Sequence, residues 1–293
     1  MADILTATLF MAMLGGLLSV GLATAGRRFH VEEDPRIDVV ESMLPGANCG
    51  ACGQAGCRAF AEAVVLGKTT PSACTVSPPE GIKAVAGYLG TDAGTAVKRV
   101  ARLACAGGTN VAWNRAVYGS EQTCRGAALI AGGGKGCAWG CLGLGDCATV
   151  CDFGAIHMNE HGLPVVDEAK CTACGDCVDV CPKDLFSIHP VSHHLWVACK
   201  SLAEGDAALA ECAVACNACG RCAADSPNGA VTMQNYLPVV DYSRGRDLSS
   251  QIIQRCPTGA IVWISDKGTV TKGASAKPVI RKEPLPVMAM KKP

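Results

Sequence analysis

The chain has 293 residues, equal numbers of acidic and basic side chains, and 20 cysteines. Zero net charge excludes a strongly basic nucleic-acid-binding protein, and a charged fraction of 18% argues against disorder over most of the length. Aromatic residues make up only 4%, so we expect bound cofactors to supply part of the packing. Twenty cysteines permit either disulfides or metal sites, and the cellular compartment decides between them.

The N-terminus carries an uncharged stretch, residues 4–25, whose 22 residues would span roughly 33 Å as a helix, enough to cross a bilayer. Asp3 precedes it, and Arg27 and Arg28 follow it. A cleaved signal peptide, one alternative to an anchor, would carry its positive charge before the apolar stretch; a buried core helix is the other. We therefore expect a single-pass anchor over residues 1–28 in the cell (inner) membrane, with the remainder in the cytoplasm. That compartment is reducing, which favours metal thiolates over disulfides.

Short helices are predicted behind the anchor. The acidic stretch 30–46 has its charged and apolar residues on different faces, and residues 59–66 form a second amphipathic stretch that stops at Gly67. Residues 81–103 are weakly helical and contain no cysteine. The last stretch, from Asp266 on, includes Lys267, Lys272, Lys277, Arg281, Lys282, Lys291 and Lys292. We expect it to be a flexible tail.

The cysteine-rich region contains an internal repeat. The sequence LPVVD occurs at residues 163–167 and again at residues 237–241. A shift of 75 residues also aligns five pairs of cysteines: Cys124 with Cys199, Cys137 with Cys212, Cys141 with Cys216, Cys147 with Cys222, and Cys181 with Cys256. The region is therefore two copies of one unit.

The first copy contains the motif C-x2-C-x2-C-x3-C-P, formed by Cys171, Cys174, Cys177 and Cys181. In this spacing three cysteines bind one [4Fe–4S] cluster and the cysteine before proline binds its neighbour. Each cluster therefore takes its fourth ligand from the other motif, which predicts two sets of ligands. One is Cys171, Cys174, Cys177 and Cys151, and the other is Cys137, Cys141, Cys147 and Cys181. The motif resembles that of bacterial two-cluster ferredoxins, which implies a compact pseudo-symmetric α+β unit. A widened first loop and Asp152 in place of proline leave the choice among Cys137, Cys141 and Cys147 open, and a zinc ribbon is the alternative.

The second copy has lost one complete set of cluster ligands. Ser226 precedes Pro227 where a cysteine is expected, and Gly245, Leu248 and Gln251 occupy the other three positions. The remaining set is complete and comprises Cys216, Cys219, Cys222 and Cys256. Coordinated loss of four ligands is what cluster binding predicts, and a disulfide framework predicts no such pattern.

A separate array lies close to the anchor, with the spacing C-x2-C-x4-C-x16-C. It consists of Cys49, Cys52, Cys57 and Cys74. Its glycines let backbone N–H groups approach cluster sulfurs, and a helix beginning near Cys57 favours a negatively charged cluster. We expect a [4Fe–4S] site, with zinc as the alternative.

Four cysteines are left over: Cys105, Cys124, Cys199 and Cys212. They could bind a fifth cluster, Cys212 could replace Cys219 as a ligand, or all four could be buried free thiols. The run GGGKG at residues 132–136 lacks the Ser or Thr of a phosphate-binding loop. With no nucleophile and base to pair, we predict no catalytic residue in this chain.

Four segments together resemble the B subunit of the Rnf complex: the anchor followed by RRF, then LPGANCGACGQAGCRAFAEAV, KGCAWGCLGLGDC and CPTGAI. The resemblance implies a component of a membrane-bound ferredoxin:NAD⁺ oxidoreductase that couples electron flow to Na⁺ or H⁺ translocation. Its implied role is to accept electrons from reduced ferredoxin and relay them through [4Fe–4S] clusters, at least four here, with a fifth left open. The implied partners are the other Rnf subunits, ferredoxin and the lipid bilayer.

The predicted fold class is therefore α+β. The anchor at 1–28 leads to a four-cysteine domain at 29–82, a connecting segment at 83–130, a two-cluster ferredoxin-like unit at 131–190, a degenerate unit at 191–264 and a tail at 265–293. Two other functions remain open. One is the iron–sulfur subunit of a different membrane oxidoreductase, and the other is a non-redox sensor that uses its four-cysteine metal sites.

Overall fold

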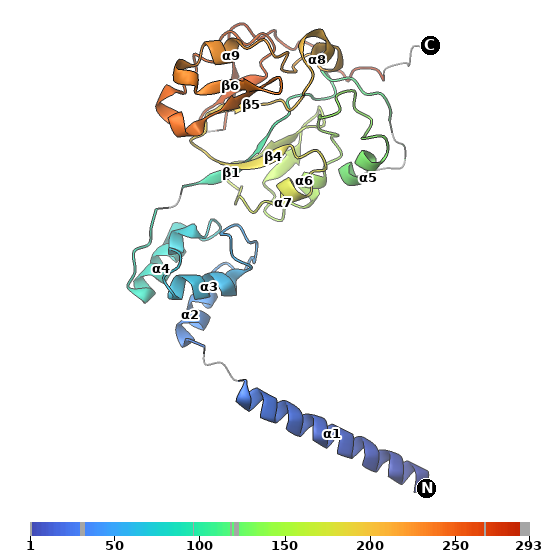
Figure 1. Ribbon diagram of the computed structural model, residues 1–293, viewed down its shortest axis with the longest axis vertical. Coiled ribbons are helices and arrows are strands. Elements are labelled where there is room, and N and C mark those ends of the chain that lie inside the picture. Colours follow the sequence, from blue (N-terminus) through green and yellow to red (C-terminus); the bar gives the residue numbers. More distant parts are fainter. Residues whose placement is uncertain are drawn as a thin grey trace.

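The computed structural model describes residues 2–29, 33–95, 97–117, 119, 123–266 and 268–287. Three lysines of the predicted tail, Lys267, Lys291 and Lys292, lie outside these residues. The chain runs from a single long helix through a small helical domain into a larger region of short helices and strands (Figure 1). The predicted α+β class is confirmed.

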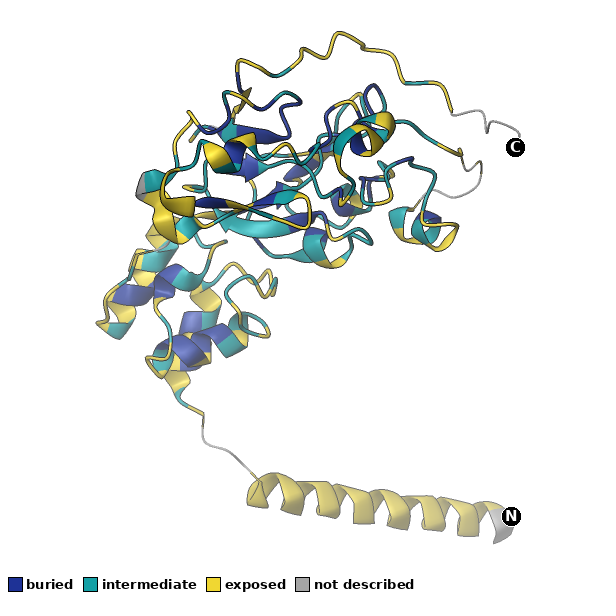
Figure 2. Cartoon of the chain, turned by 45° about the horizontal axis from the view of Figure 1, so that its top comes forward, coloured by how far each residue is buried: buried dark blue, intermediate teal, exposed yellow. Residues whose placement is uncertain are grey.

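Helix α1 (Ala2–Arg28) is apolar on all sides and exposed along the whole of its described surface (Figure 2). Arg27 and Arg28 lie in its last turn, where cations interact favourably with the helix dipole. Among the described residues it is the one helix that is long and apolar enough to cross a membrane, judged by length and composition. Within the part of the chain that the structure describes, this helix packs against no apolar partner, as expected if lipid surrounds it.

Three helices and a 3-10 turn form the next domain: α2 (Pro35–Met43), α3 (Cys57–Val65), η1 (Pro71–Ala73) and α4 (Pro79–Leu89). Asp34 caps α2 by accepting a hydrogen bond from the Arg36 backbone N–H. The helix ends before Pro45, which disfavours helical backbone at the residue preceding it. Val40, Phe60 and Val85 pack together in the core. Of the helix predicted at 30–46, residues 35–43 are helical, while residues 30–32 lie outside the described residues.

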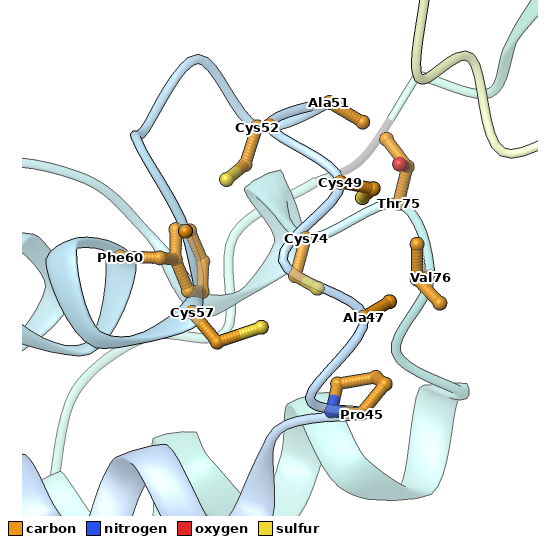
Figure 3. Close-up of a pocket in the computed structure, with 12 residues that line it drawn as sticks. Pro45, Ala47, Cys49, Ala51, Cys52, Cys57, Phe60, Cys74, Thr75 and Val76 are labelled. Atoms are coloured by element: carbon orange, nitrogen blue, oxygen red, sulfur yellow. The ribbon is translucent and has the colours of Figure 1, made fainter. Parts of the chain in front are cut away.

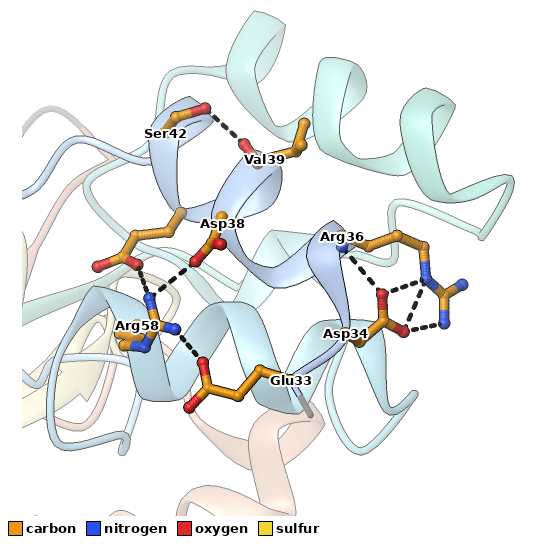
Figure 4. Close-up of polar contacts among 8 residues, drawn as sticks. Glu33, Asp34, Arg36, Asp38, Val39, Ser42 and Arg58 are labelled. Atoms are coloured by element: carbon orange, nitrogen blue, oxygen red, sulfur yellow. Dashed lines mark hydrogen bonds and ion pairs between the residues drawn. The ribbon is translucent and has the colours of Figure 1, made fainter. Parts of the chain in front are cut away.

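Arg58 ties α3 to the segment that carries α2 (Figure 4). Its guanidinium contacts the carboxylates of Glu33, Asp38 (3.0 Å) and Glu41 (2.8 Å). Hydrogen bonds to these three carboxylates, led by Glu33, raise the pKa of Arg58. Exposed ion pairs contribute little one by one, so the network chiefly fixes the relative orientation of α2 and α3. Because Arg58 immediately follows Cys57, the same network also helps to fix the position of a predicted metal ligand.

The first ferredoxin-like unit contains three short helices and two antiparallel strand pairs. Its elements are β1 (Arg99–Leu103), α5 (Cys124–Leu129), α6 (Asp146–Thr149), β2 (Ile156–Met158), β3 (Pro164–Val166), α7 (Asp176–Asp179) and β4 (Phe186–Pro190). Strand β1 pairs with β4, and β2 pairs with β3. Residues 99–103 are thus a strand, where a continuing weak helix was expected, because the backbone of β4 provides their hydrogen-bond partners. The unit therefore begins before residue 131 and includes part of the predicted connecting segment.

The second unit repeats this arrangement. Its elements are β5 (Leu195–Val197), α8 (Gly205–Glu211), α9 (Arg221–Ala224), η2 (Pro227–Gly229), β6 (Val231–Gln234), β7 (Leu237–Val240), η3 (Tyr242–Asp247), β8 (Ile261–Ile264) and β9 (Val270–Lys272). The 75-residue shift places α6 on α9, the start of β2 on that of β6, and the start of β4 on that of β8. The repeat predicted from the sequence is confirmed.

Leu248 and Ser226 show what replaces the lost cluster ligands of the second unit. Leu248, in the position of a cysteine, packs against a core that contains Ile252 and Ile253. Ser226, in the position of another, accepts a hydrogen bond from the Val231 backbone N–H at 2.9 Å. The second unit is therefore stabilised by ordinary hydrophobic packing where the first unit has cysteines.

The segment predicted to be a flexible tail is docked over its described part, residues 268–287. Strand β9 pairs with β8. Further along, the Leu285 N–H donates to the Thr109 carbonyl at 2.8 Å, and the Asn110 side chain donates to the Arg281 carbonyl at 3.0 Å. The flexible-tail prediction is wrong for this part, because backbone hydrogen bonds outweigh the segment's proline and lysine content.

Replacement of Gly273 tests this docking. A methyl group there would lie 1.9 Å from the carbonyl oxygen of Ile253, so Gly273→Ala should cost about 1–3 kcal/mol through overpacking. The matched control is Gly245→Ala, because Gly245 has open space around its Cα. Thermal unfolding of the two full-length variants should show a lower melting temperature only for Gly273→Ala, and equal melting temperatures would contradict the docked strand.

Candidate metal centres

Cysteines gather in five cavities, and each cavity is lined by four of them. The quartets are Cys49, Cys52, Cys57 and Cys74 (site I); Cys124, Cys141, Cys147 and Cys181 (site II); Cys151, Cys171, Cys174 and Cys177 (site III); Cys216, Cys219, Cys222 and Cys256 (site IV); and Cys105, Cys137, Cys199 and Cys212 (site V). Each cavity encloses about 320–370 Å³ of space, open solvent at its mouth included. All 20 cysteines of the chain are used once.

Site I brings together the quartet predicted from the anchor-proximal array. Figure 3 shows its four sulfur atoms around a common space, with Cys57 at the start of α3 and Cys74 following η1. Asn48 orders the loop, since its side-chain oxygen accepts a hydrogen bond from the Cys57 N–H at 2.8 Å. Gly56 must remain glycine, because a Cβ there would lie 2.9 Å from the same oxygen and its φ is 146°.

Site III brings together the predicted set of three clustered cysteines and one distant cysteine. Two backbone N–H groups donate to its sulfurs at 3.4 Å: that of Ala155 to Cys151 and that of Ala101 to Cys171. Ala101 belongs to β1, so this strand supplies part of the wall around the site. Site IV likewise contains its predicted quartet, and Cys212 does not replace Cys219.

Site II differs from the predicted grouping, because Cys124 stands where Cys137 was expected. The Asp146 carboxylate accepts hydrogen bonds from the backbone N–H groups of Cys124 (2.8 Å) and Arg125 (3.1 Å). This contact holds the start of α5 against the start of α6, which carries Cys147. Cys137 lies instead in site V, with three cysteines left unassigned by the motif spacing.

Burial raises the pKa of many of these thiols above its usual value. Desolvation is the leading cause at Cys141, Cys147, Cys177, Cys212 and Cys216, each raised to about 12. These five thiols are therefore protonated near neutral pH when no metal is bound. A bound cationic group would displace their protons and stabilise the thiolates, so binding would release protons and favour the fold.

The cysteines of each quartet surround a space and do not meet at one point. In the described part of the chain, no three side chains of Cys, His, Asp or Glu converge closely enough to hold a single metal ion. Cysteines bound to one zinc ion would all lie about 2.3 Å from it. The four-cysteine donor set fits a [4Fe–4S] cluster, which takes one thiolate at each of its four irons.

Two protein-family profiles match the chain. One, described as "Putative Fe-S cluster", covers residues 44–76. The other, described as "4Fe-4S dicluster domain", covers residues 136–185. They contain all four cysteines of sites I and III, three of the four cysteines of site II, and Cys137 of site V.

Three curated relatives match most of the chain. The B subunit of a Na⁺-translocating ferredoxin:NAD⁺ oxidoreductase complex from Acetobacterium woodii is 40% identical over 270 residues, 92% of this chain and 79% of the relative. The B subunit of an ion-translocating oxidoreductase complex from Methanosarcina acetivorans is 35% identical over 86% of this chain and 95% of the relative. The B subunit of a proton-translocating ferredoxin:NAD⁺ oxidoreductase complex from Clostridium ljungdahlii is 39% identical over 86% of this chain and 89% of the relative.

The chain belongs to the family of Rnf B subunits. The two matching profiles, an iron–sulfur domain and a [4Fe–4S] dicluster domain, support iron–sulfur clusters in the parts of the chain that they cover. Cysteine is the ligand that [4Fe–4S] clusters take, four to a cluster. The quartets of this Rnf family member meet that requirement, and their backbone donors supply N–H···S hydrogen bonds of the kind that tune cluster potentials.

The grouping in site II can be tested with Cys124→Ser. Since Cys124 lines site II, the variant should lose about four irons per chain, measured as iron and acid-labile sulfide after anaerobic purification of the full chain. The control Leu129→Ser places a hydroxyl on the same short helix at a side chain that is 86% exposed, and it should keep its iron. Full iron content in Cys124→Ser would mean that Cys124 is a free thiol and does not bind a cluster in site II.

Proposed function

We propose that this chain is the membrane-anchored electron-transfer subunit of an ion-translocating ferredoxin:NAD⁺ oxidoreductase complex. It takes electrons from reduced ferredoxin and passes them on through [4Fe–4S] clusters held in sites I to IV. The coupling ion is Na⁺ or H⁺. The observation that carries the proposal is that all the cysteines gather in four-thiol cavities, and that contacts between their walls join neighbouring cavities.

In this role the residues of the chain hold, bury and orient the clusters. A [4Fe–4S] cluster accepts and gives back an electron with little movement of its ligands. The protein therefore needs neither a nucleophile nor a proton donor at these sites. Its contribution is to exclude water, to fix the sulfurs, and to donate hydrogen bonds such as that from the Leu185 N–H to the Cys181 sulfur at 3.5 Å. Flavin and nicotinamide chemistry would belong to other subunits.

Contacts between the sites support a relay. The Thr75 hydroxyl, in the wall of site I, donates a hydrogen bond of 2.6 Å to the carbonyl of Thr172 in the wall of site III. Thr75 follows Cys74 and Thr172 follows Cys171, so a path of covalent bonds and one hydrogen bond connects a ligand of each site. Within the first unit, Cys177 of site III and Cys147 of site II share one core.

The anchor sets the expected location of the relay. Helix α1 would span the membrane once, and the arginines at its end favour the cytoplasmic side for everything that follows. Site I is the site nearest to α1 along the chain. Sites I and III would therefore carry electrons between the membrane surface and the larger ferredoxin-like region, where reduced ferredoxin would dock.

The function is tested by mixing reduced ferredoxin with the full chain in detergent. Stopped-flow absorbance should show bleaching of the iron–sulfur band of the chain, at a rate that falls as salt is added, because an electrostatic dock is screened. A chain that dithionite reduces and ferredoxin does not would contradict the proposed donor. A rate independent of ionic strength would contradict the electrostatic dock alone.

The junction between sites I and III is tested with Thr75→Val, which keeps the side-chain shape and removes the hydroxyl. Iron content should stay unchanged, while freeze-quench electron paramagnetic resonance should show slower electron exchange between the two sites. Thr75→Ser keeps a hydroxyl and should retain the wild-type rate. Equal rates in all three proteins would mean that electrons do not use this junction.

A further inference from the structure

Site IV is the site with a ligand on the molecular surface. Among all 20 cysteines, Cys219 is the one that is exposed, while the other three cysteines of site IV, Cys216, Cys222 and Cys256, are buried. A cluster held there would come closer to a partner protein than one held by a buried quartet. We propose that the surface around Cys219 is where the chain takes up electrons from a carrier protein with carboxylates around its redox group. The inference rests on the proposed function, in which that carrier is reduced ferredoxin.

Two arginines lie beside Cys219. Arg221 follows it by two residues, at the start of α9, where it is exposed and forms no ion pair with a carboxylate in the described part of the chain. Arg255 precedes Cys256, and its Nε donates to the Asp225 carboxylate at 2.8 Å. Hydrogen bonding to Asp225 is the leading cause of the raised pKa of Arg255, and the negative charge of a Cys219 thiolate adds to it. The Arg255 guanidinium is therefore close enough to Cys219 for their charges to interact.

The docked C-terminal segment adds two lysines to this surface. The Lys277 N–H donates to the Pro257 carbonyl at 3.1 Å. The Lys272 side chain lies over Gly259, where a Cβ would come 2.8 Å from the Lys272 Cδ atom. Thr258, between Pro257 and Gly259, lines site IV. Both lysines are exposed, and within the described residues neither pairs with a carboxylate. The basic charge of the segment predicted to be a tail is therefore placed beside site IV.

The two arginines belong to the second unit alone. The 75-residue shift that relates the units places Asp146 at the position of Arg221 and Val180 at the position of Arg255. Site II, the counterpart of site IV, lacks both cations, and its Asp146 instead accepts a hydrogen bond from the Cys124 N–H. The fold of the unit therefore does not require arginines at these positions. Of the four cations beside site IV, only Arg255 is paired with a carboxylate among the described residues, so the surface is basic.

An exposed tyrosine lies beside the same site. Tyr236 is 49% exposed, and its carbonyl oxygen is 3.8 Å from the Cys216 sulfur. Its φ of 66° is in the left-handed region, which a bulky residue rarely adopts. With Asn235 (φ 47°) it forms the turn of the β6–β7 hairpin, where glycine is common. Tyrosine and arginine are enriched among the residues that contribute most to binding at protein interfaces, so an exposed tyrosine near basic side chains suits contact with a partner protein.

A carrier with carboxylates around its redox group fits this surface. A cluster with four thiolate ligands is negatively charged and would repel such a carrier, and the nearby cations offset that repulsion. Opposite charges also steer the carrier towards the site and raise the encounter rate. The carrier loses one electron and site IV gains it, with no bond made or broken.

The position of site IV suits entry at one end of the relay. Figure 1 shows α9, which carries Cys222, on the side of the ferredoxin-like region away from α3 and α4. On its inner side, the Cys216 N–H donates to the sulfur of Cys199 at 3.3 Å, in the wall that both units share. Site I lies in the anchor-proximal domain, so electrons that enter at site IV would cross both ferredoxin-like units before they reach it.

The docking surface is tested with the double variant Arg221→Gln/Lys277→Gln, which removes two cations and no cysteine. Its iron content and its reduction by dithionite should match the wild type. The second-order rate of its reduction by reduced ferredoxin should fall about tenfold at low ionic strength and depend less on salt, because two charges no longer steer the encounter. The matched control Lys83→Gln/Lys98→Gln removes two exposed cations outside this surface and should keep the wild-type rate.

Equal rates and equal salt dependence in the Arg221→Gln/Lys277→Gln variant and the wild type would overturn the docking surface. The proposed function would survive that result, since ferredoxin would still reduce the chain at another place. A wild-type chain that ferredoxin does not reduce would instead refute the proposed function itself.

A second measurement requires no variant. A carbodiimide joins carboxylates of ferredoxin to lysines that they touch, and mass spectrometry of the cross-linked complex should locate the links at Lys272 or Lys277. High salt should abolish these links. Links found only at other lysines, such as Lys83 or Lys183, would overturn the proposal. Links from Lys272 and Lys277 to another subunit of the complex, with none to ferredoxin, would also overturn it, because the surface would then be an internal interface.

Discussion

The convergence of four thiols from distant segments on one buried space is the constraint on which this structure depends. Cysteines stand within the hydrophobic cores themselves: Cys216, Cys222 and Cys256 pack with isoleucines in the second unit, and Cys147 and Cys177 pack with Phe186 in the first. A chain with so few aromatic residues relies on these positions for its core. Because burial disfavours free thiolates, clusters bound in these sites would stabilise the packing, and folding would be coupled to cluster assembly.

The second unit shows what happens when this constraint is removed. Its lost site has no isolated cysteine left behind, and Leu248, Ile252 and Ile253 form a continuous apolar core around it. The serine that remains keeps a backbone hydrogen bond like that of its cysteine counterpart, which accepts from the Ala155 N–H in the first unit. A site is thus retained as a complete quartet or replaced as a whole, because three thiols around an empty space would satisfy neither metal binding nor packing.

Much of this arrangement could be predicted from the sequence where ligands are close together along the chain. The cysteine spacing around Cys171 and around Cys49 reflects local geometry. Together with the 75-residue repeat, it was enough to predict the quartets of sites I, III and IV. The exchange of Cys137 for Cys124 could not be predicted, because it depends on the Asp146 carboxylate that holds α5 against α6. Likewise, β1 and β9 are strands only because β4 and β8 provide hydrogen-bond partners, information that no local pattern contains.

The two ends of the proposed relay differ in how firmly their parts are joined. The walls of site V come from both ferredoxin-like units, so this cavity joins the two units. The anchor-proximal domain is joined to the first unit by the Thr75–Thr172 hydrogen bond, which no shared ligand reinforces. Electron transfer among sites II, III and IV would therefore depend on a rigid assembly. Transfer to site I would depend on this contact, which makes that junction the step most sensitive to the relative position of the membrane anchor.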